Sequence, residues 1–291
     1  MQGSSLIQAR IARRYDALSP QLQKAARFIL ESPDEVATRS LRQVAQSAGV
    51  APPTLSRLAR ALDCERYEAL REICRQDIKR RSRSLAEKTR SLQALDLESD
   101  EAERQPYLLR QTHAALGSLG AMAQDIDVPE LRAAVDRLSA AERVLLIGTM
   151  SSGFFVQYMG YMAAMAFDNW HLVLDQAEGV ASRLAQAGPA DVAVVISHAP
   201  YARRSVDAAR LCRLAGTYVL AITDSAASPL LGVASAHLLA PTDSPQFFPS
   251  HVATLNLIES IMGMLVRRAH PAIGDRVAAV EAANRSLGEY W

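Results

Sequence analysis

The sequence predicts an α + α/β chain: an all-helical helix-turn-helix domain followed by a five-stranded parallel-sheet α/β sandwich. Three observations predict it. Two short helical segments flank a glycine within residues 40–62, five short apolar runs separated by helix-like segments follow residue 143, and the charge changes sign between the two parts. The 291 residues, 49% hydrophobic and 22% charged, suffice for two globular domains, each with its own core.

Two helices are expected before the glycine-centred pair. A helix over residues 4–18 would have an apolar face and a basic face, formed by Leu6, Ile7, Ile11 and Leu18 and by Arg10, Arg13 and Arg14 respectively. The Ser-Pro pair at 19–20 is typical of a helix start, and a second Ser-Pro pair at 32–33 ends that helix near Glu31.

The segment 40–62 has the signals of two helices joined by a tight turn. Ser40 can cap the first helix, and Gln43 can complete a capping box. Gly49 supplies the turn, and the prolines at 52 and 53 suit a first helical turn, where no intrahelical amide bond is lost. This is a device that places one helix against DNA.

The second helix of this pair has an apolar stripe and a polar face. The stripe consists of Leu55, Leu58, Ala59 and Leu62, and the outward residues are Thr54, Ser56, Arg57 and Arg60. Hydroxyl groups and guanidinium forks suit phosphate oxygens and guanine edges. We predict that DNA is contacted by Ser40, Gln43, Thr54, Ser56, Arg57 and Arg60; the alternative is an ordinary helical hairpin with a solvated basic face.

The charge distribution supports the first interpretation. Residues 1–90 carry 18 Lys and Arg against 10 Asp and Glu, a net charge of +8, whereas residues 91–291 carry 14 against 21, a net charge of −7. A basic module joined to an acidic body is typical of a protein whose first part alone binds a polyanion. We therefore divide the chain into a helix-turn-helix domain (1–80), a helical linker packing on the next domain (81–140), an α/β domain (141–270) and a helical tail (271–291).

The α/β domain is indicated by its continuous apolar runs, which predict strands buried on both faces of a parallel sheet. These runs are 144–147, 171–174, 192–196, 218–222 and 237–240, and Gly216 is placed to stop a helix before the fourth. In such sheets ligands bind beyond the carboxyl ends of the strands. The loops to consider are therefore 148–153, 197–204, 223–225 and 242–251.

The first of these loops has the composition of an anion site. Gly148, Ser151 and Ser152 offer small residues and hydroxyl groups at the start of a helix, where free amides and the helix dipole attract anions. The alternative is that one serine only caps the helix. In the last loop, Phe247 and Phe248 either cover a pocket or pack beneath the loop.

The cysteines and the distribution of apolar residues argue against a disulfide-rich, metal-binding, secreted or membrane protein. Cys64, Cys74 and Cys212 are odd in number and lack metal-ligand spacing, so we expect neither disulfides nor a metal site, and no cofactor motif is present. The N-terminus has no signal-peptide core, and the apolar stretch 153–167 is too short to span a bilayer. We expect a cytoplasmic protein.

Taken together, the chain resembles the RpiR family of bacterial transcription regulators, which join an N-terminal helix-turn-helix domain to a sugar isomerase (SIS) domain. The resemblance is carried by residues 18–37, by LRQVAQSAGVAPPTLSRLARALDCERYEALR at 41–71, and by ERVLLIGTMSSG, VAVVISHAPYARRSVDAARL and VLAITDSAASPLLGVASAHLLAP. It implies a regulator whose SIS domain binds a small effector, usually a phosphosugar. By position, Ser152 matches the serine of the first phosphate loop.

The second loop departs from the family pattern Ser-x-Ser-Gly-x-Thr or Ser. Here it reads Ser197-His-Ala-Pro-Tyr-Ala202, so two hydroxyls are replaced by methyls and one amide donor by proline; Met150 also replaces the glycine usual in the first loop. Because a phosphate needs several converging donors, we predict an effector other than a typical phosphosugar. Its candidate contacts are Gly148, Ser151, Ser152, Ser197, His198, Tyr201, Arg203 and His251. Alternatively, His198 only caps the helix, Arg203 and Arg204 are exposed, or the pocket serves assembly alone.

The expected partners are double-stranded operator DNA, palindromic because the reader would act as a symmetric homodimer or homotetramer, and a small effector; no membrane partner is expected. The alternative function is a SIS-fold sugar-phosphate isomerase or lyase. That reaction needs a general base, for which Glu259 and His251 are the candidates.

Overall fold

The computed structural model describes residues 7, 10–11, 14–81, 84–94, 106–173, 180–226 and 228–290. The chain divides into two compact units. One, the N-terminal unit, comprises Met1–Gly117 and Asp243–Pro249; the other, the C-terminal unit, comprises Ser118–Thr242 and Ser250–Trp291. The predicted boundaries at residues 80, 140 and 270 follow sequence character instead, and they stay a prediction.

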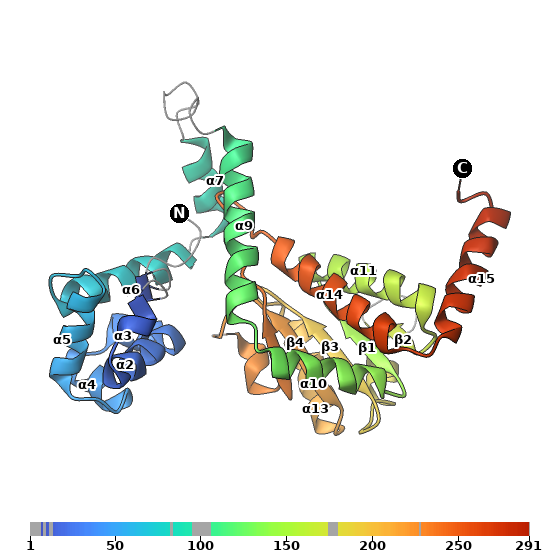
Figure 1. Ribbon diagram of the computed structural model, residues 1–291, viewed down its shortest axis with the longest axis horizontal. Coiled ribbons are helices and arrows are strands. Elements are labelled where there is room, and N and C mark those ends of the chain that lie inside the picture. Colours follow the sequence, from blue (N-terminus) through green and yellow to red (C-terminus); the bar gives the residue numbers. More distant parts are fainter. Residues whose placement is uncertain are drawn as a thin grey trace. The chain divides into compact units, whose positions relative to one another are not determined.

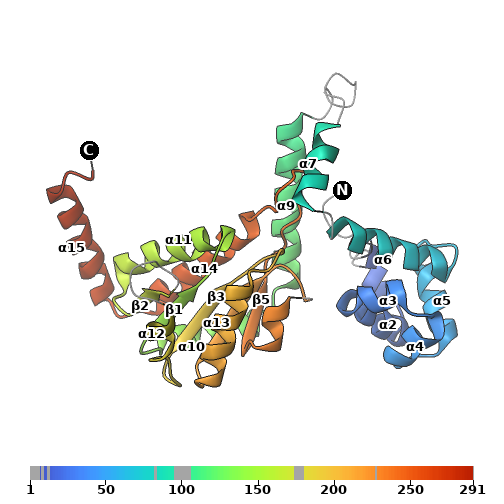
Figure 2. The ribbon, with the colours of Figure 1, turned by 180° about the vertical axis from the view of Figure 1, so that it is seen from behind.

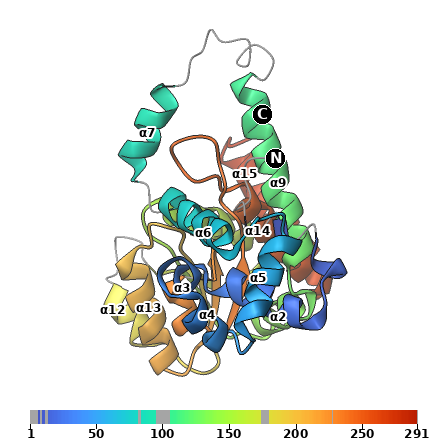
Figure 3. The ribbon, with the colours of Figure 1, turned by 90° about the vertical axis from the view of Figure 1, so that its left-hand side faces the viewer.

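The N-terminal unit is helical (Figure 1, Figure 3). Its described elements are η1 (Tyr15–Ala17), α2 (Pro20–Glu31), α3 (Pro33–Thr38), α4 (Leu41–Ser47), α5 (Pro52–Ala61), α6 (Tyr67–Arg81), α7 (Leu85–Gln93) and the first part of α9 (Tyr107–Asp125). The helix expected to begin at the Ser-Pro pair and end at Glu31 is confirmed as α2. Of the basic residues expected on the first helix, Arg13 lies outside the described residues, as does Leu6 on its apolar face.

The core of this unit is built from the apolar stripes that the sequence predicts. Ile29 on α2, Leu55 and Leu58 on α5, and Leu70 on α6 are fully buried. Each such side chain stabilises the fold by roughly 1.5–3 kcal/mol relative to exposure. The helices of this unit are therefore held together by one hydrophobic core as well as by the turns between them.

The C-terminal unit contains one five-stranded, all-parallel sheet (Figure 2). Its strands are β1 (Val144–Ile147), β2 (Trp170–Leu172), β3 (Val192–Ile196), β4 (Tyr218–Thr223) and β5 (Ala236–Leu239), in the order β2-β1-β3-β4-β5. The predicted parallel α/β fold is confirmed; Leu174, expected in the second strand, lies outside the described residues. The strands β1 and β3 are completely buried, and β4 is buried except at Tyr218, which explains the continuous apolar runs.

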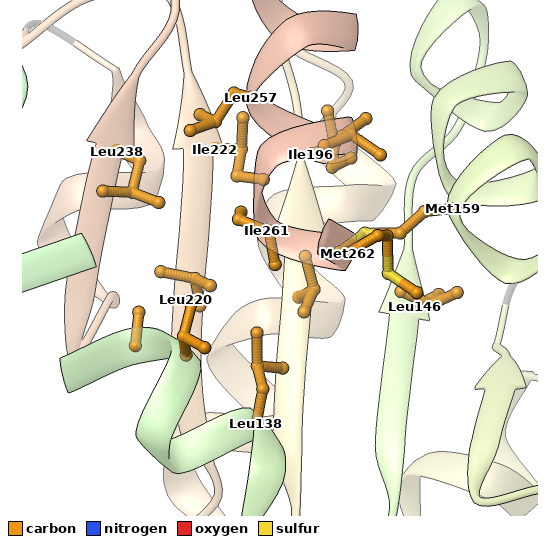
Figure 4. Close-up of a cluster of buried hydrophobic side chains, with 14 of the residues drawn as sticks. Leu138, Leu146, Met159, Ile196, Leu220, Ile222, Leu238, Leu257, Ile261 and Met262 are labelled. Atoms are coloured by element: carbon orange, nitrogen blue, oxygen red, sulfur yellow. The ribbon is translucent and has the colours of Figure 1, made fainter. Parts of the chain in front are cut away.

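Helices cover both faces of this sheet. Three lie on one face, namely α10 (Val128–Ser139), α11 (Ser151–Ala166) and α14 (Val252–Arg268), and the other face is covered by α12 (Val180–Leu184), α13 (Arg203–Leu214) and η2 (Pro229–Gly232). Ile196, Ile222 and Leu257 of α14 belong to one hydrophobic cluster, in which Ile222 lies beside Leu257 (Figure 4). The chain ends with α15 (Ala272–Ser286).

Membrane-spanning helices and disulfides are both absent from the described residues. In the part of the chain that the structure describes, each helix is too short or too polar to cross a bilayer. None of the three cysteines forms a disulfide, and all three are buried.

Candidate functional site

The helix pair α4–α5 begins with the predicted capping box. The amide of Gln43 donates to Ser40 Oγ at 3.4 Å, and the amide of Ser40 donates to Gln43 Oε1 at 3.0 Å. Two amides at the start of α4 are thereby satisfied. Ser40 and Gln43 are exposed, and their role in DNA contact stays a prediction.

The turn between the helices depends on Gly49. Its φ of +61° lies in the left-handed region, and a Cβ atom there would meet Lys24 Nζ at 2.8 Å. Lys24 donates to the Gly49 carbonyl oxygen at 2.9 Å, so a side chain from α2 holds the turn. The predicted turn is confirmed, and its lysine support is an addition that spacing within the motif cannot reveal.

The outward face of α5 consists of Ser56, which is half-buried, and the exposed Arg57 and Arg60. The prediction that Thr54 faces outward is wrong, since its side chain is buried. Thr54 precedes Leu58 by one helical turn and so belongs to the buried stripe. Its Oγ1 accepts a hydrogen bond from Arg57 Nη2 at 3.4 Å. Thr54 therefore orients an arginine instead of facing solvent.

Two arginines from the beginning of the chain stabilise the end of α5. Arg10 Nη1 donates to the carbonyl oxygens of Leu62 and Asp63 at 3.0 and 3.2 Å, and Arg14 pairs with Asp63 at 2.9 Å. Asp63 has a φ of +59°, a conformation common after helix ends. The expectation that Arg10 faces outward is thus wrong, because unpaired carbonyls at a helix end attract cations.

A further basic residue belongs to the same helix pair. Arg42 lies exposed on the first turn of α4, one residue from the capping box. The periodicity of α4 places it opposite the buried Val44, so the sequence contains the signal that identifies it. It joins Arg57 and Arg60 as a candidate for phosphate contact.

In the C-terminal unit, the loop after β1 packs tightly on α11. A Cβ at Gly148 would lie 2.7 Å from the Ser152 carbonyl oxygen, so glycine is required by close approach. Met150 is the N-cap of α11, with a φ of +55° and an exposed side chain. The structure shows no side-chain cap on this helix, so the alternative that a serine caps it is wrong. Ser152 is buried and Ser151 half-buried.

The polar groups of this first loop bond to one another. The amides of Ser152 and Gly153 donate to the carbonyls of Thr149 and Met150, both at 3.1 Å. Thr149 Oγ1 and Ser205 Oγ lie 2.9 Å apart, which joins the loop to α13. Donors that would face a phosphate at a helix N-terminus are therefore partly engaged within the protein.

The second loop begins with Ser197, which is buried in a network of hydroxyls. Ser197 Oγ accepts from the Ala202 amide at 3.4 Å, and its carbonyl accepts from Thr223 Oγ1 at 2.7 Å. Thr223 Oγ1 also lies 2.8 Å from Ser228 Oγ. The predicted site residue Ser197 thus has a clear structural role at the carboxyl ends of β3 and β4.

A carboxylate lies beside this loop. Asp224, partly buried after β4, accepts hydrogen bonds from the Tyr201 hydroxyl and the Ala199 amide, as well as from Thr223 Oγ1 at 3.4 Å. Burial raises the pKa of Asp224, and these hydrogen bonds oppose that shift by stabilising the ionised form. Tyr201, a predicted effector contact, is thereby oriented by an acidic group.

The Arg203 side chain is directed to solvent and to an acidic residue of its own helix. Its side chain is 95% exposed, and its Nε lies 3.5 Å from the Asp207 carboxylate on the same helix. This placement agrees with the alternative that Arg203 and Arg204, the first two residues of α13, are exposed, and a ligand contact by Arg203 stays a prediction. A surface pocket of about 520 Å³ does adjoin the loop, lined by Tyr201, Arg203, Val206, Asp207, Arg210 and Pro229.

The remaining predicted contacts, His198 and His251, meet beneath the loops. Their ring centroids are 4.9 Å apart, and the Phe155 ring of α11 lies 4.7 Å from that of His251. His198 is buried, and its Nε2 lies 3.0 Å from Thr254 Oγ1 of α14. Burial, together with the neighbouring His251, lowers the pKa of His198 to about 3, and burial lowers the pKa of His251.

We call the group formed by His198, His251 and Thr254 the histidine cluster. His198 and His251 were both predicted as site residues. Thr254 was not, because it lies inside an apolar helix. Asp224 lies in the loop 223–225, one of the loops expected beyond the carboxyl ends of the strands. His198 bonds to α14 and does not cap α13, whose N-cap is Ala202 without a side-chain bond.

Sequence comparison identifies both parts of the chain. The profile of the helix-turn-helix domain of the rpiR family matches residues 5–80, and that of the SIS domain matches residues 137–265. The HTH-type transcriptional regulators HexR of Escherichia coli and Pseudomonas aeruginosa are each 27% identical, over 267 and 272 residues; each match covers 89% of this chain and 88% of the relative.

Solved structures have the same fold. The Vibrio vulnificus NanR protein, complexed with ManNAc-6P, matches with a TM-score of 0.57 and 20% identity, covering 97% of this chain and 98% of that one. The sugar isomerase domain of an RpiR transcription factor from Sphaerobacter thermophilus matches with a TM-score of 0.56 and 20% identity, covering 64% of this chain and all of that one.

Proposed function

This chain belongs to the RpiR family of transcription regulators, and we propose that an effector bound by its SIS domain changes the affinity of its helix-turn-helix domain for operator DNA. The protein is a DNA-binding regulator with a SIS effector domain. What remains to be tested is which residues contact DNA and which ligand is sensed.

The observation that carries the DNA-reading proposal is the exposed basic face of α5. Arg57 and Arg60 are exposed on the second helix of the pair, while its apolar stripe is buried in the core. Guanidinium groups at such positions bind phosphates or the acceptor edge of guanine. Arg57 is also oriented by Thr54, which favours a directed contact over a freely moving charge.

The proposal is tested by measuring DNA affinity by fluorescence anisotropy, with a duplex that the wild-type protein selects from a random pool. Arg57→Ala should weaken binding by about 1–3 kcal/mol. Arg285→Ala, which removes an exposed arginine on α15, is the matched control and should bind as the wild type does. Equal affinity of Arg57→Ala and wild type would remove Arg57 from the interface.

We further propose that the effector is not a typical phosphosugar. NanR, a structural relative, is complexed with ManNAc-6P, a phosphorylated sugar. In this chain, however, Pro200 lacks an amide donor and the Ala199 amide bonds to Asp224. The loop that would hold a phosphate thus has fewer donors than that ligand requires.

The proposed assembly is a homodimer or homotetramer that reads a palindromic operator in the cytoplasm. A symmetric pair of readers matches two half-sites one helical turn apart. Size-exclusion chromatography with light scattering tests the oligomer, and footprinting tests the symmetry of the operator. A monomer that protects a single half-site would contradict this proposal.

We propose that the chain has no enzymatic activity, against the alternative of a sugar-phosphate isomerase or lyase. The relatives at 27% identity are named as regulators. Of the two candidate bases, Glu259 is exposed and bonds to the Tyr158 hydroxyl at 3.0 Å, two turns of α14 away from His251. Turnover of a sugar phosphate by the full chain, lost in Glu259→Gln or His251→Gln, would restore the enzymatic alternative.

A further inference from the structure

The helix α11 is uncharged on both of its sides. Its 16 residues, Ser151–Ala166, include no Asp, Glu, Lys or Arg, although such residues make up 22% of the chain. One side lies on the sheet, where Val156, Met159 and Ala163 are buried and Met159 belongs to the same hydrophobic cluster as Leu146 (Figure 4). A helix that covers a sheet needs such an apolar inner side. The fold of one chain does not require the outer side to be uncharged.

Three aromatic side chains are exposed on the outer side of α11. They are Phe154, Tyr158 and Tyr161, and their spacing of four and three residues places them along one side of the helix. We call them the aromatic face. Phe154 is 72% exposed and Tyr161 66%, whereas Tyr158 is 37% exposed and donates its hydroxyl to Glu259 of α14 at 3.0 Å. Aromatic residues are enriched and charged residues depleted at the centres of protein–protein interfaces.

The aromatic face is large enough to form the centre of an interface. A whole aromatic side chain has roughly 200 Å² of surface, so the three exposed fractions correspond to roughly 350 Å². Patches of this size on a folded chain are often functional. A standard interface buries about 800 Å² on each partner, so the aromatic face would supply close to half of it.

The neighbouring helix α14 continues this surface. The helices α11 and α14 lie next to each other on the sheet (Figure 1, Figure 2). Glu259, Gly263 and Val266 follow one another on an exposed side of α14 at helical spacing, and the bond from Tyr158 to Glu259 joins that side to the aromatic face. The surface available for a partner is therefore wider than α11 alone.

The lack of charge favours a second copy of this chain as the partner. In a symmetric dimer the same patch meets itself, so a charged residue near the twofold axis would face a like charge. The aromatic face avoids this repulsion. By contrast, α13 on the other face of the sheet exposes Arg203, Arg204, Arg210 and Arg213, which would repel their own copies. Of these two helices, α11 is the one suited to a symmetric contact.

The same helix also borders the candidate effector site. It begins at the loop in which Gly148 packs against Ser152, and the ring of Phe155 lies 4.7 Å from that of His251. Phe154, the preceding residue, is exposed on the aromatic face. A partner on this face would thus contact the helix that contacts the histidine cluster.

We propose that two copies of the chain associate through the aromatic faces of their α11 helices, with the exposed side of α14 at the edge of the contact. The inference rests on the proposed homodimer or homotetramer, to which it assigns a surface. In a dimer the loss of this contact leaves monomers, and in a tetramer it leaves smaller assemblies.

The test measures the mass of the full chain by light scattering after size-exclusion chromatography. Tyr161→Arg places a charge where it would meet its own copy, so it should reduce the mass of the assembly at least to one half. Leu214→Arg replaces an exposed leucine at the end of α13 and is the matched control, which should keep the wild-type mass. Circular dichroism and thermal unfolding verify that both variants are folded.

Two milder variants keep the test decisive if Tyr161→Arg does not fold. Phe154→Ala and Tyr161→Ala should each raise the dissociation constant of the assembly about 30-fold, as expected for truncation of an aromatic residue at the centre of an interface. Leu214→Ala should leave that constant unchanged. Sedimentation at several protein concentrations measures the constants. Wild-type constants in both aromatic variants would overturn the inference.

Operator binding by the same preparations separates this inference from the proposed function. We expect Tyr161→Arg to bind a duplex with two half-sites more weakly than the wild type, and a duplex with one half-site equally well. If the wild type associates and every variant of the aromatic face keeps its mass, the inference fails and the proposed assembly stands. If the wild type is a monomer that binds its selected duplex, the inference and the assembly both fail, the regulator stands, and the aromatic face is left to a different protein.

Discussion

At the scale of single residues, Met150 has a backbone conformation that favours glycine. Its φ of +55° and ψ of −132° lie in a sparsely populated region that costs an L-residue about 1–3 kcal/mol, and its exposed side chain regains little by burial. Met150→Gly should therefore raise the free energy of unfolding by about 0.5–1 kcal/mol, after allowance for the greater chain entropy of glycine. Urea denaturation measures the change. Met150→Ala keeps the unfavourable φ and should not stabilise the protein; if it stabilised as much as glycine, backbone strain would not be the cause.

The buried His198 predicts how stability depends on pH. Its pKa is about 3 in the folded protein and about 6.5 in the unfolded chain, so between these values the unfolded chain binds the additional proton. The stabilisation is complete above pH 6.5 and is lost as the pH falls. From pH 6.5 to pH 5, His198 should reduce the free energy of unfolding by about 2 kcal/mol.

Denaturation curves at several pH values measure this slope. His198→Gln removes the titrating group, so its stability should be lower at pH 7.5 but flatter between pH 6.5 and 5. His113→Gln, which replaces an exposed histidine, is the control and should keep the wild-type slope. An unchanged slope in His198→Gln would show that other groups control the acid sensitivity.

Residues that bond within a local segment were predictable, whereas those with distant partners were not. The capping box of Ser40 and Gln43 spans three positions, so the sequence contains the whole interaction. Arg10 was expected to face solvent because its partners, Leu62 and Asp63, are more than fifty residues away. Thr54 was expected to face solvent because its side chain is polar, but its spacing from Leu58 places it on the buried stripe.

At the scale of elements, the turn between α4 and α5 should be sensitive to substitution. Gly49→Ala introduces a Cβ at positive φ that meets Lys24, and we expect a loss of about 1–2 kcal/mol in stability. Gly117→Ala is the control, since this helical glycine of α9 has open space around it and should gain up to about 1 kcal/mol. Thermal unfolding measures both. A neutral Gly49→Ala would mean that the turn relaxes without cost.

Most elements were predictable because their sequence patterns are periodic and strong. The strands β1 and β3 coincide with uninterrupted apolar runs, and α2 begins and ends at Ser-Pro pairs. The site was predictable only in part. The loops follow from the strand ends, but the bond from Tyr201 to Asp224 joins two loops whose distance is set by strand order, which one sequence does not give.

At the scale of the whole molecule, the division of charge predicts how DNA binding responds to salt. Basic residues concentrated in the first 90 positions release counterions on binding, so affinity should fall steeply with salt. Removing one phosphate contact should reduce the slope of log affinity against log salt by about 1. Titrations of wild type, Arg42→Ala and Arg285→Ala at several salt concentrations measure this. An unchanged slope in Arg42→Ala would exclude a phosphate contact by this residue.

The stretch Asp243–Pro249 determines how the chain can be divided into fragments. It groups with the N-terminal unit, where Ser244 Oγ donates to Gln111 Oε1 of α9 at 3.2 Å, yet the chain on either side of it belongs to the C-terminal unit. The next residue after Pro249 is Ser250, whose side chain is buried and which directly precedes His251 of the histidine cluster. The ring of Pro249 fixes its φ, so this junction is stiff. At this point a single peptide bond separates Ser250, in the C-terminal unit, from the unit that contains the helix pair α4–α5. A fragment beginning at residue 118 would lack Gln111, the α9 residue to which Ser244 is bound.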